Sequence, residues 1–172
     1  ERQAQALGLP LIEIPLPGDC SEGEYESRLL DVLGQVKADG INHVVFGDIF
    51  LEWIKDYREK NLARVGMTPV LPIWGRKTAE LSRSFVALGF RAVITCVDTK
   101  VVPGSFLGRV FDEQFLAELP PGVDPDGENG EFHSFVFAGP IFRESIPYTP
   151  GKVVSRDAYS FCDVLPVKGV RR

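Results

Sequence analysis

The first hundred positions of this 172-residue chain alternate between amphipathic segments and short apolar runs. Apolar side chains recur every three to four positions in the amphipathic segments, which predicts helices over 23–38, 49–65 and 78–88. The apolar runs are rich in β-branched residues and predict strands over 41–46, 69–74 and 91–97. Alternation of strand and helix is typical of repeated βα units. We therefore expect an α/β fold with a parallel sheet and helices outside it.

The N-terminal residues predict the end of a helix followed by an extended segment. Residues 1–8 have a helical pattern that Gly8 stops, and prolines interrupt the extended run over 9–16. The chain has no initial Met and starts within a helical pattern. We therefore expect it to be part of a longer protein.

The pattern changes after about residue 99. A short helix is predicted over 112–119, a loop rich in Pro, Gly and Asp over 119–130, and strands over 131–138 and 152–163. This change predicts two domains, an α/β domain over 1–99 and a smaller α+β domain over 100–172.

Composition limits the classes of partner. The chain has 19 Lys and Arg residues against 24 Asp and Glu residues, a formal net charge of −5. An acidic chain binds nucleic acid and anionic membranes poorly, so neither is expected as a partner. No apolar run is long enough to span a bilayer and no signal peptide is visible, which favours a cytoplasmic protein. The oligomeric state stays open, a homodimer included.

Cysteine and histidine are too sparse for a metal site or a disulfide framework. The three cysteines, Cys20, Cys96 and Cys162, are widely spaced, and the histidines are His43 and His133. We expect reduced thiols and no metal site.

The segment GENGEFH over 127–133 concentrates groups that can do chemistry. It holds two carboxylates, an amide and an imidazole framed by two glycines, namely Gly127, Glu128, Asn129, Gly130, Glu131 and His133. If a strand begins near Glu131, alternation places Glu131 and His133 on one face and leaves Glu128 in the loop. Such a group could bind a cation or an amine, or supply a base. A solvated polar turn is the alternative interpretation.

Further candidates follow the predicted strands. Gly47 and Asp48 come after one strand and Trp74 after another, where ligands bind in parallel sheets. Asp48 could contact a ribose or Mg²⁺, or it could cap the next helix. Trp74 could stack on a base or lie in the core.

Two arginines could bind an anion. Arg109 follows Gly108 and could hold a phosphate or carboxylate through two hydrogen bonds, and Arg58 on the predicted third helix could do the same. Surface arginines without a ligand are the alternative. Cys96, within a predicted strand, is expected to be a buried apolar residue rather than a nucleophile.

These motifs together resemble a known family. VVFGDIFLEWIKDYRE, PIWG, SFLGR and GENGEFHSFVFAGPIF resemble, in order, motifs of the PP-loop ATP-pyrophosphatase family that includes diphthine–ammonia ligase. The resemblance implies a parallel-sheet, adenine-nucleotide α-hydrolase-like (Rossmann-like) sandwich and a smaller C-terminal domain. It also implies ATP with Mg²⁺, release of AMP and pyrophosphate, and a carboxylate that is adenylated and then attacked by ammonia.

The resemblance assigns roles to the residues that match the motifs. Those implied to line the nucleotide cleft are Gly47, Asp48, Arg58 and Trp74. Those implied to bind the acceptor substrate are Gly108, Arg109, Gly127, Asn129 and Gly130. Those implied to be catalytic are Glu128, Glu131 and His133.

The chain departs from the family pattern at two places. The phosphate-binding S-G-G-K-D-S loop is absent and would precede residue 1. GENGEFH and the later FCDVLP resemble bacterial members rather than the GEGGE form of the ligases proper, which favours a different amide-forming reaction. A nucleotide-binding module without turnover and a metal-dependent hydrolase built on Glu128, Glu131 and His133 are the alternatives.

Overall fold

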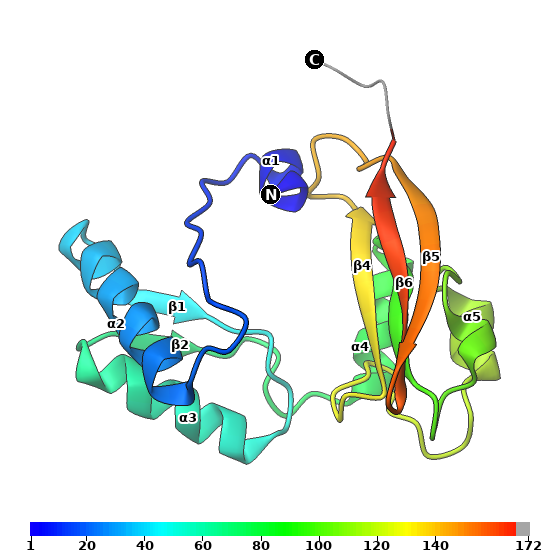
Figure 1. Cartoon of the computed structure of the whole chain (residues 1–172), viewed down its shortest axis with the longest axis horizontal. Coiled ribbons are helices and arrows are strands. Elements are labelled where there is room, and N and C mark those ends of the chain that lie inside the picture. Colours follow the sequence, from blue (N-terminus) through cyan, green and yellow to red (C-terminus); the bar gives the residue numbers. More distant parts are fainter. Residues whose placement is uncertain (168–172) are drawn as a thin grey trace. The chain divides into compact units, whose positions relative to one another are not determined.

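The computed structural model describes residues 1–167, and these form two compact units. The parallel unit is Ile12–Arg76, and the antiparallel unit is Glu1–Leu11 together with the chain from Lys77 onward. Figure 1 shows the elements of each unit. Within 1–167, none of the helices combines the length and the apolar character that crossing a bilayer requires.

The parallel unit contains two helices and two short strands. Its elements are α2 (Glu22–Ala38), β1 (His43–Val45), α3 (Glu52–Arg64) and β2 (Thr68–Val70). The strands pair in parallel, with His43 opposite Thr68. This confirms the predicted βαβ order, although each strand has only three residues. The extended run over 9–16 forms no strand.

Local sequence explains how these helices begin and end. Ser21 caps α2, because its Oγ accepts a hydrogen bond from Glu24 N at 3.2 Å. At the end of α3, Lys37 Nζ donates to Val65 O at 2.7 Å and to Gly66 O at 3.0 Å. A cation on the last carbonyls satisfies acceptors that the helix leaves without partners.

The antiparallel unit is a four-stranded sheet with helices. Its strands run in the order β4-β3-β6-β5, and neighbouring strands pair antiparallel. The strands are β3 (Arg91–Asp98), β4 (Phe132–Ala138), β5 (Tyr148–Arg156) and β6 (Tyr159–Pro166). The helices are α1 (Arg2–Leu7), α4 (Thr78–Ala87), the 3-10 turn η1 (Gly104–Phe106) and α5 (Glu113–Glu118).

Phenylalanine dominates the core between this sheet and its helices. Phe115 is fully buried, and its ring centroid lies 5.5 Å from that of Phe106, 5.1 Å from Phe111 and 5.4 Å from Phe132. α4 contributes Phe85 to the same cluster. Burial of such rings is worth roughly 2–3 kcal/mol each, so this cluster fixes the helices on the sheet.

Two expectations about the fold need correction. β3, predicted as a strand of the parallel sheet, pairs antiparallel with β4 and β6. The boundary between the two compact units lies at Arg76 and Lys77, and the domain boundary near residue 99 stays a prediction. The single strand predicted over 152–163 is a hairpin of β5 and β6, turning at Asp157, whose φ is 52°.

The mixed α/β class is confirmed, because one sheet is parallel and the other antiparallel. The α-hydrolase-like sandwich stays a prediction, because the parallel sheet of the described residues has two strands. All three cysteines are free, and Cys96 is 4% exposed. Burial, with a contribution from Asp98, raises the pKa of the Cys96 thiol, in agreement with an apolar rather than a nucleophilic role.

Candidate functional site

One group of predicted residues lies at the carboxyl edge of the parallel strands. Gly47 and Asp48 follow β1, and Trp74 follows β2. The loops after the two strands are joined, because Gly75 N donates to Ile49 O at 2.7 Å. The parallel pairing therefore brings the two predicted strand ends to one edge.

Asp48 pairs with Arg58 and does not cap a helix. Asp48 Oδ2 lies 3.4 Å from Arg58 Nε, and the two side chains are 16% and 29% exposed. α3 begins at Glu52 with Leu51 as its cap residue, so the capping interpretation of Asp48 is wrong. The Arg58 guanidinium also lies 4.6 Å from the Phe46 ring centroid. Arg58 is therefore anchored beside the strand end by a carboxylate and a ring.

Lys55 was missed by the sequence reasoning. Its Nζ lies 5.1 Å from the Trp74 ring centroid. Lys55 and Arg58 are three residues apart on α3, so they share a helical face. That spacing was the signal that could have found it. Two cations and an indole near one strand edge can bind an anion attached to a planar ring.

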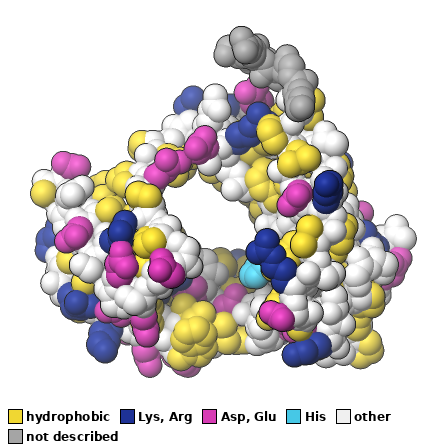
Figure 2. Space-filling view, in the orientation of Figure 1, with side chains coloured by type: hydrophobic (Ala, Val, Ile, Leu, Met, Phe, Trp, Pro, Cys, Tyr) yellow, Lys and Arg dark blue, Asp and Glu magenta, His cyan; other side chains and the backbone are white. Residues whose placement is uncertain are grey.

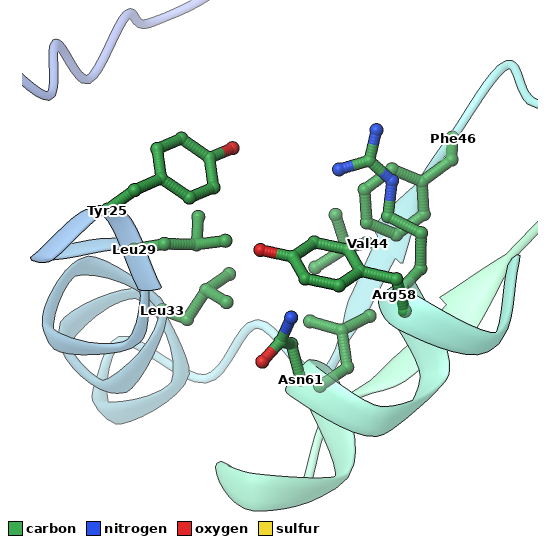
Figure 3. Close-up of a pocket in the computed structure, with 9 residues that line it drawn as sticks. Tyr25, Leu29, Leu33, Val44, Phe46, Arg58 and Asn61 are labelled. Carbon is green, nitrogen blue, oxygen red and sulfur yellow. The ribbon is translucent and has the colours of Figure 1, made fainter. Parts of the chain in front are cut away.

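A small cavity opens beside Arg58 within the parallel unit. It measures about 80 Å³ and lies between α2, β1 and α3. Figure 3 shows Tyr25, Leu29 and Leu33 projecting from α2 toward Val44 of β1 and Asn61 of α3. The lining is mostly apolar, so the space suits an apolar group rather than a phosphate.

Two polar groups at this cavity stand out. Asn61 is 3% exposed; its Oδ1 accepts from Arg64 at 3.2 Å, but its buried Nδ2 has no hydrogen-bond partner among residues 1–167. Burial, followed by the charge of Glu26, raises the pKa of Tyr57. Tyr57 therefore keeps its proton at neutral pH.

The GENGEFH segment forms a second group, in the antiparallel unit. Glu131 is 8% exposed, and its carboxylate accepts three hydrogen bonds from its own loop. The donors are Asp124 N at 3.0 Å, Asn129 N at 3.1 Å and Asn129 Nδ2 at 3.0 Å. Burial acts to raise the pKa of Glu131, but these hydrogen bonds outweigh it and hold the pKa below its usual value. Glu131 is thus an ionised centre around which the loop is built.

Asp124 organises the preceding turn in the same way. Its Oδ1 accepts from Asp126 N at 3.0 Å and from Glu128 N at 3.3 Å. Asp126 Oδ1 in turn accepts from Ser82 Oγ of α4 at 2.9 Å. The sequence pattern predicts this stretch only as a loop of turn-forming residues. The recurrence of acids in DPDGENGE was the available signal.

The expected common face of Glu131 and His133 is wrong. β4 begins at Phe132, Glu131 turns into the loop, and the side chain of His133 is exposed beside Cys96 of β3. The physical reason is that the loop amides hold the Glu131 carboxylate before strand alternation starts.

Gly127 is required by geometry, whereas Gly130 has more freedom. Gly127 has φ of 69°, and a Cβ there would meet Phe132 O at 2.8 Å. Gly130 has φ of 87°, with nothing within 4 Å of a Cβ. Both positions favour glycine, but at Gly127 a side chain would also collide with the backbone.

Gly108 forms a hydrogen bond to β3, and Arg109 forms one to α5. Gly108 N donates to Ile94 O at 2.9 Å, with φ of 75° at the glycine. Arg109 Nη1 donates to Glu118 Oε2 at 2.7 Å, and its guanidinium lies 4.7 Å from the Phe106 ring centroid. A hydrogen bond from Gln114 and then one from Arg109 lower the pKa of Glu118. Arg109 already has an acidic partner here, so an anionic ligand would have to replace Glu118.

The predicted residues thus fall into two groups. The nucleotide-cleft group belongs to the parallel unit, and the GENGEFH group belongs to the antiparallel unit. A cavity shared by the nucleotide-cleft group and the GENGEFH group stays a prediction. Within 1–167, no group of three or more His, Cys, Asp or Glu side chains could hold a metal ion. Figure 2 shows acidic and basic side chains interspersed on the displayed face.

The antiparallel unit is also the part of the chain that a family model matches. Residues 77–165, more than half of the chain, match the diphthamide synthase C-terminal domain. The chain belongs to this family. The match begins where the antiparallel unit resumes after Arg76. The diphthamide synthase C-terminal domain therefore includes α4, the four-stranded sheet and the loop built around Glu131.

Similarity to curated proteins extends over both units. The chain is 26% identical over 176 residues to a protein of Bos taurus named diphthine–ammonia ligase, covering 94% of the chain and 66% of the relative. Proteins of the same name from Homo sapiens and Mus musculus are 27% and 28% identical, again with 94% and 66% covered. The chain thus spans about two thirds of the length of these relatives.

Proposed function

We propose that this chain is part of an ATP-dependent, AMP-forming amide ligase that adenylates a carboxylate for attack by ammonia. The observation that carries the proposal is the family match over 77–165, which includes the GENGE loop, together with similarity over 94% of the chain to proteins named diphthine–ammonia ligase. The parallel arrangement of β1 and β2 supports nucleotide binding, because ligands bind beyond the carboxyl ends of such strands.

The residues at the carboxyl edge of the parallel strands suit a nucleotide. Trp74 offers an indole for stacking, and Lys55 and Arg58 offer positive charge for a phosphate. Gly47 leaves open space, since nothing lies within 4 Å of a Cβ built there. When bound, ATP would supply the adenylyl group. The chain's own part is to hold its base and phosphates in place, which is the main contribution in reactions of this kind.

Mg²⁺ has no dedicated cluster among the described side chains. We therefore derive no step from a protein-held metal, and Mg²⁺ enters the proposal only as the companion of the ATP phosphates.

The roles of the three predicted catalytic residues differ. Glu131 is a positioning residue, because three loop donors already bind its carboxylate. Glu128 and His133 are the remaining candidates for moving a proton, Glu128 from the loop and His133 from the start of β4. Gly127, Asn129 and Gly130 shape the loop that presents them to the acid substrate.

The alternative is a nucleotide-binding protein that acts on a different small-molecule acid. Asn129 favours it: this residue stands within the GENGE loop and clamps Glu131 through both its backbone and its side chain. A loop with an amide in this position presents different groups to a substrate than a loop with glycine there.

The test is product analysis with the full-length protein. ATP labelled at the α-phosphate is incubated with ammonium and a panel of acids, diphthine-bearing protein included, and AMP and pyrophosphate are measured. AMP formation that depends on one acid supports the ligase and identifies the substrate. Release of ADP and phosphate would overturn it. His133→Gln and His43→Gln form a matched pair, because only the first should lower the rate of AMP formation.

A further inference from the structure

A second cavity lies wholly inside the antiparallel unit and has no role in the function proposed above. It measures about 100 Å³. One wall is the face of β4 that carries alternate residues Phe132, Ser134 and Val136. Phe85 of α4, Phe111 and Asp126 complete the lining.

Three aromatic rings give this cavity a fixed shape. The centroid of Phe111 lies 5.6 Å from that of Phe85, with the rings at 89°, and 6.3 Å from that of Phe132. Phe111 and Phe132 are only 6% and 4% exposed, so packing in the core holds both rings. Rings around a small space attract a cation more strongly than a neutral polar molecule, because each ring face carries partial negative charge.

Asp126 adds an incompletely satisfied carboxylate to the same lining. Its Oδ1 accepts from Ser82 Oγ at 2.9 Å, whereas its buried Oδ2 has no hydrogen-bond partner within residues 1–167. A buried carboxylate oxygen without a donor is costly. A ligand with an N–H or a positive charge would remove that cost.

The nearby charges favour a cation further. The carboxylates of Asp124 and Glu128 both interact electrostatically with Asp126. Ion pairs of the described residues do not include Asp126. Burial, followed by these two carboxylates, raises the pKa of Asp126 to about 6, so the group is mostly ionised at neutral pH. An ionised carboxylate with acidic neighbours and no basic partner attracts a small positive ligand.

We propose that this cavity binds a small ammonium cation, held by the Asp126 carboxylate and by the rings of Phe85, Phe111 and Phe132. The volume suits ammonium with one or two waters, since a water occupies about 30 Å³, or one methylated ammonium group. A role in supplying nitrogen to the reaction rests on the proposed ligase function, whereas the binding itself does not.

The test is a titration of the full-length protein followed by backbone amide chemical shifts, without ATP. Ammonium chloride, methylammonium chloride and tetramethylammonium chloride are compared with potassium chloride at the same ionic strength. We expect saturable shifts at Phe85, Asp126 and Ser134 with at least one ammonium salt, at concentrations on the order of millimolar. Potassium should give none of them.

Variants identify the contacts. Asp126→Asn keeps an oxygen for Ser82 but removes the charge, and should weaken binding about tenfold or more. Asp157→Asn is the matched control, because it removes an exposed carboxylate elsewhere and Asn tolerates its positive φ. Phe85→Leu should weaken ammonium binding while keeping the cavity apolar. Ser134→Leu, which fills the exposed side of the cavity, should abolish binding without changing Asp126.

The outcomes separate the hypotheses. Tighter binding of tetramethylammonium than of ammonium would identify a methylated head group as the occupant, and the reverse order would identify ammonium. Equal shifts with potassium, or unchanged binding in both Asp126→Asn and Ser134→Leu, would overturn the ammonium site. If ammonium binding persists in a protein that forms no AMP, the proposed ligase function is wrong. The proposed ammonium site in the cavity is then still supported.

Discussion

The two candidate sites hold their carboxylates by different means. In the parallel unit, Asp48 pairs with the Arg58 cation at 3.4 Å across a partly exposed surface. In the antiparallel unit, Asp124 and Glu131 are surrounded by amide donors of their own loop. An ion pair of this kind is open to salt and to a competing anion, whereas the amide-held loop is part of the fold. The Asp48–Arg58 site is therefore better suited than the amide-held loop to exchanging an anionic ligand.

The largest expected effect comes from Gly127. Gly127→Ala should destabilise the antiparallel unit by about 3 kcal/mol, because the residue has positive φ and a Cβ would meet Phe132 O. Gly130→Ala is the control; its φ is also positive but its surroundings are open, and it should cost about 1 kcal/mol. Urea unfolding measures both. Equal losses would mean that the close approach at Gly127 contributes nothing.

Glu131→Gln should cost about 2 kcal/mol at pH 7, because the loop amides lose a charged acceptor. The pKa of Glu131 is lowered in the folded protein, so its stabilisation is present above the usual glutamate pKa of about 4.3 and is lost as the pH falls through the folded value. Thermal unfolding between pH 3 and pH 8 measures the difference, which should shrink in acid. Glu59→Gln, at an exposed carboxylate of α3, is the control. A difference that does not depend on pH would contradict the role of the charge.

Asp126→Asn should stabilise the protein by about 1–2 kcal/mol at pH 7.5, the opposite sign from Glu131→Gln. The pKa of Asp126 rises to about 6 on folding, so wild-type stability falls as the pH rises from the unfolded value of 3.8 toward 6. The gain should disappear below pH 4, where both states of the wild type bind the proton. Thermal unfolding with Asp157→Asn as control measures it, and a loss of stability at pH 7.5 would show that Oδ2 has a donor.

The smallest loss of stability is expected at the carboxyl edge of the parallel strands. Arg58→Met should cost about 0.5 kcal/mol at low salt and less at 1 M salt, because the pair with Asp48 is partly exposed. The same variant should weaken nucleotide binding to the full-length protein far more than it changes unfolding. Calorimetry with ATP measures the binding, with Arg28→Met, whose arginine lies on α2, as control. Unchanged ATP affinity would remove Arg58 from the nucleotide site.

Much of the secondary structure could be predicted from local pattern. α2, α3 and α4 occur within a few residues of the expected ranges, and the loop over 119–130 precedes β4 as expected. The hairpin of β5 and β6 was missed, because it turns at Asp157 without a glycine. The candidate site was predicted in composition but not in geometry. GENGEFH was singled out, yet Glu131 and His133 do not share a face, and Lys55, Asn61 and Asp126 were overlooked.

The sequence by itself determined the helices, the apolar strands and the family to which residues 77–165 belong, because side-chain periodicity and motif order are local properties. Only the tertiary structure decided that β3 joins an antiparallel sheet, because strand direction depends on the partners that a strand meets across distant sequence. It also decided that both Glu131 carboxylate oxygens have donors while Asp126 Oδ2 has none among residues 1–167. A carboxylate's chemistry depends on which donors reach it, and those donors are placed by folding.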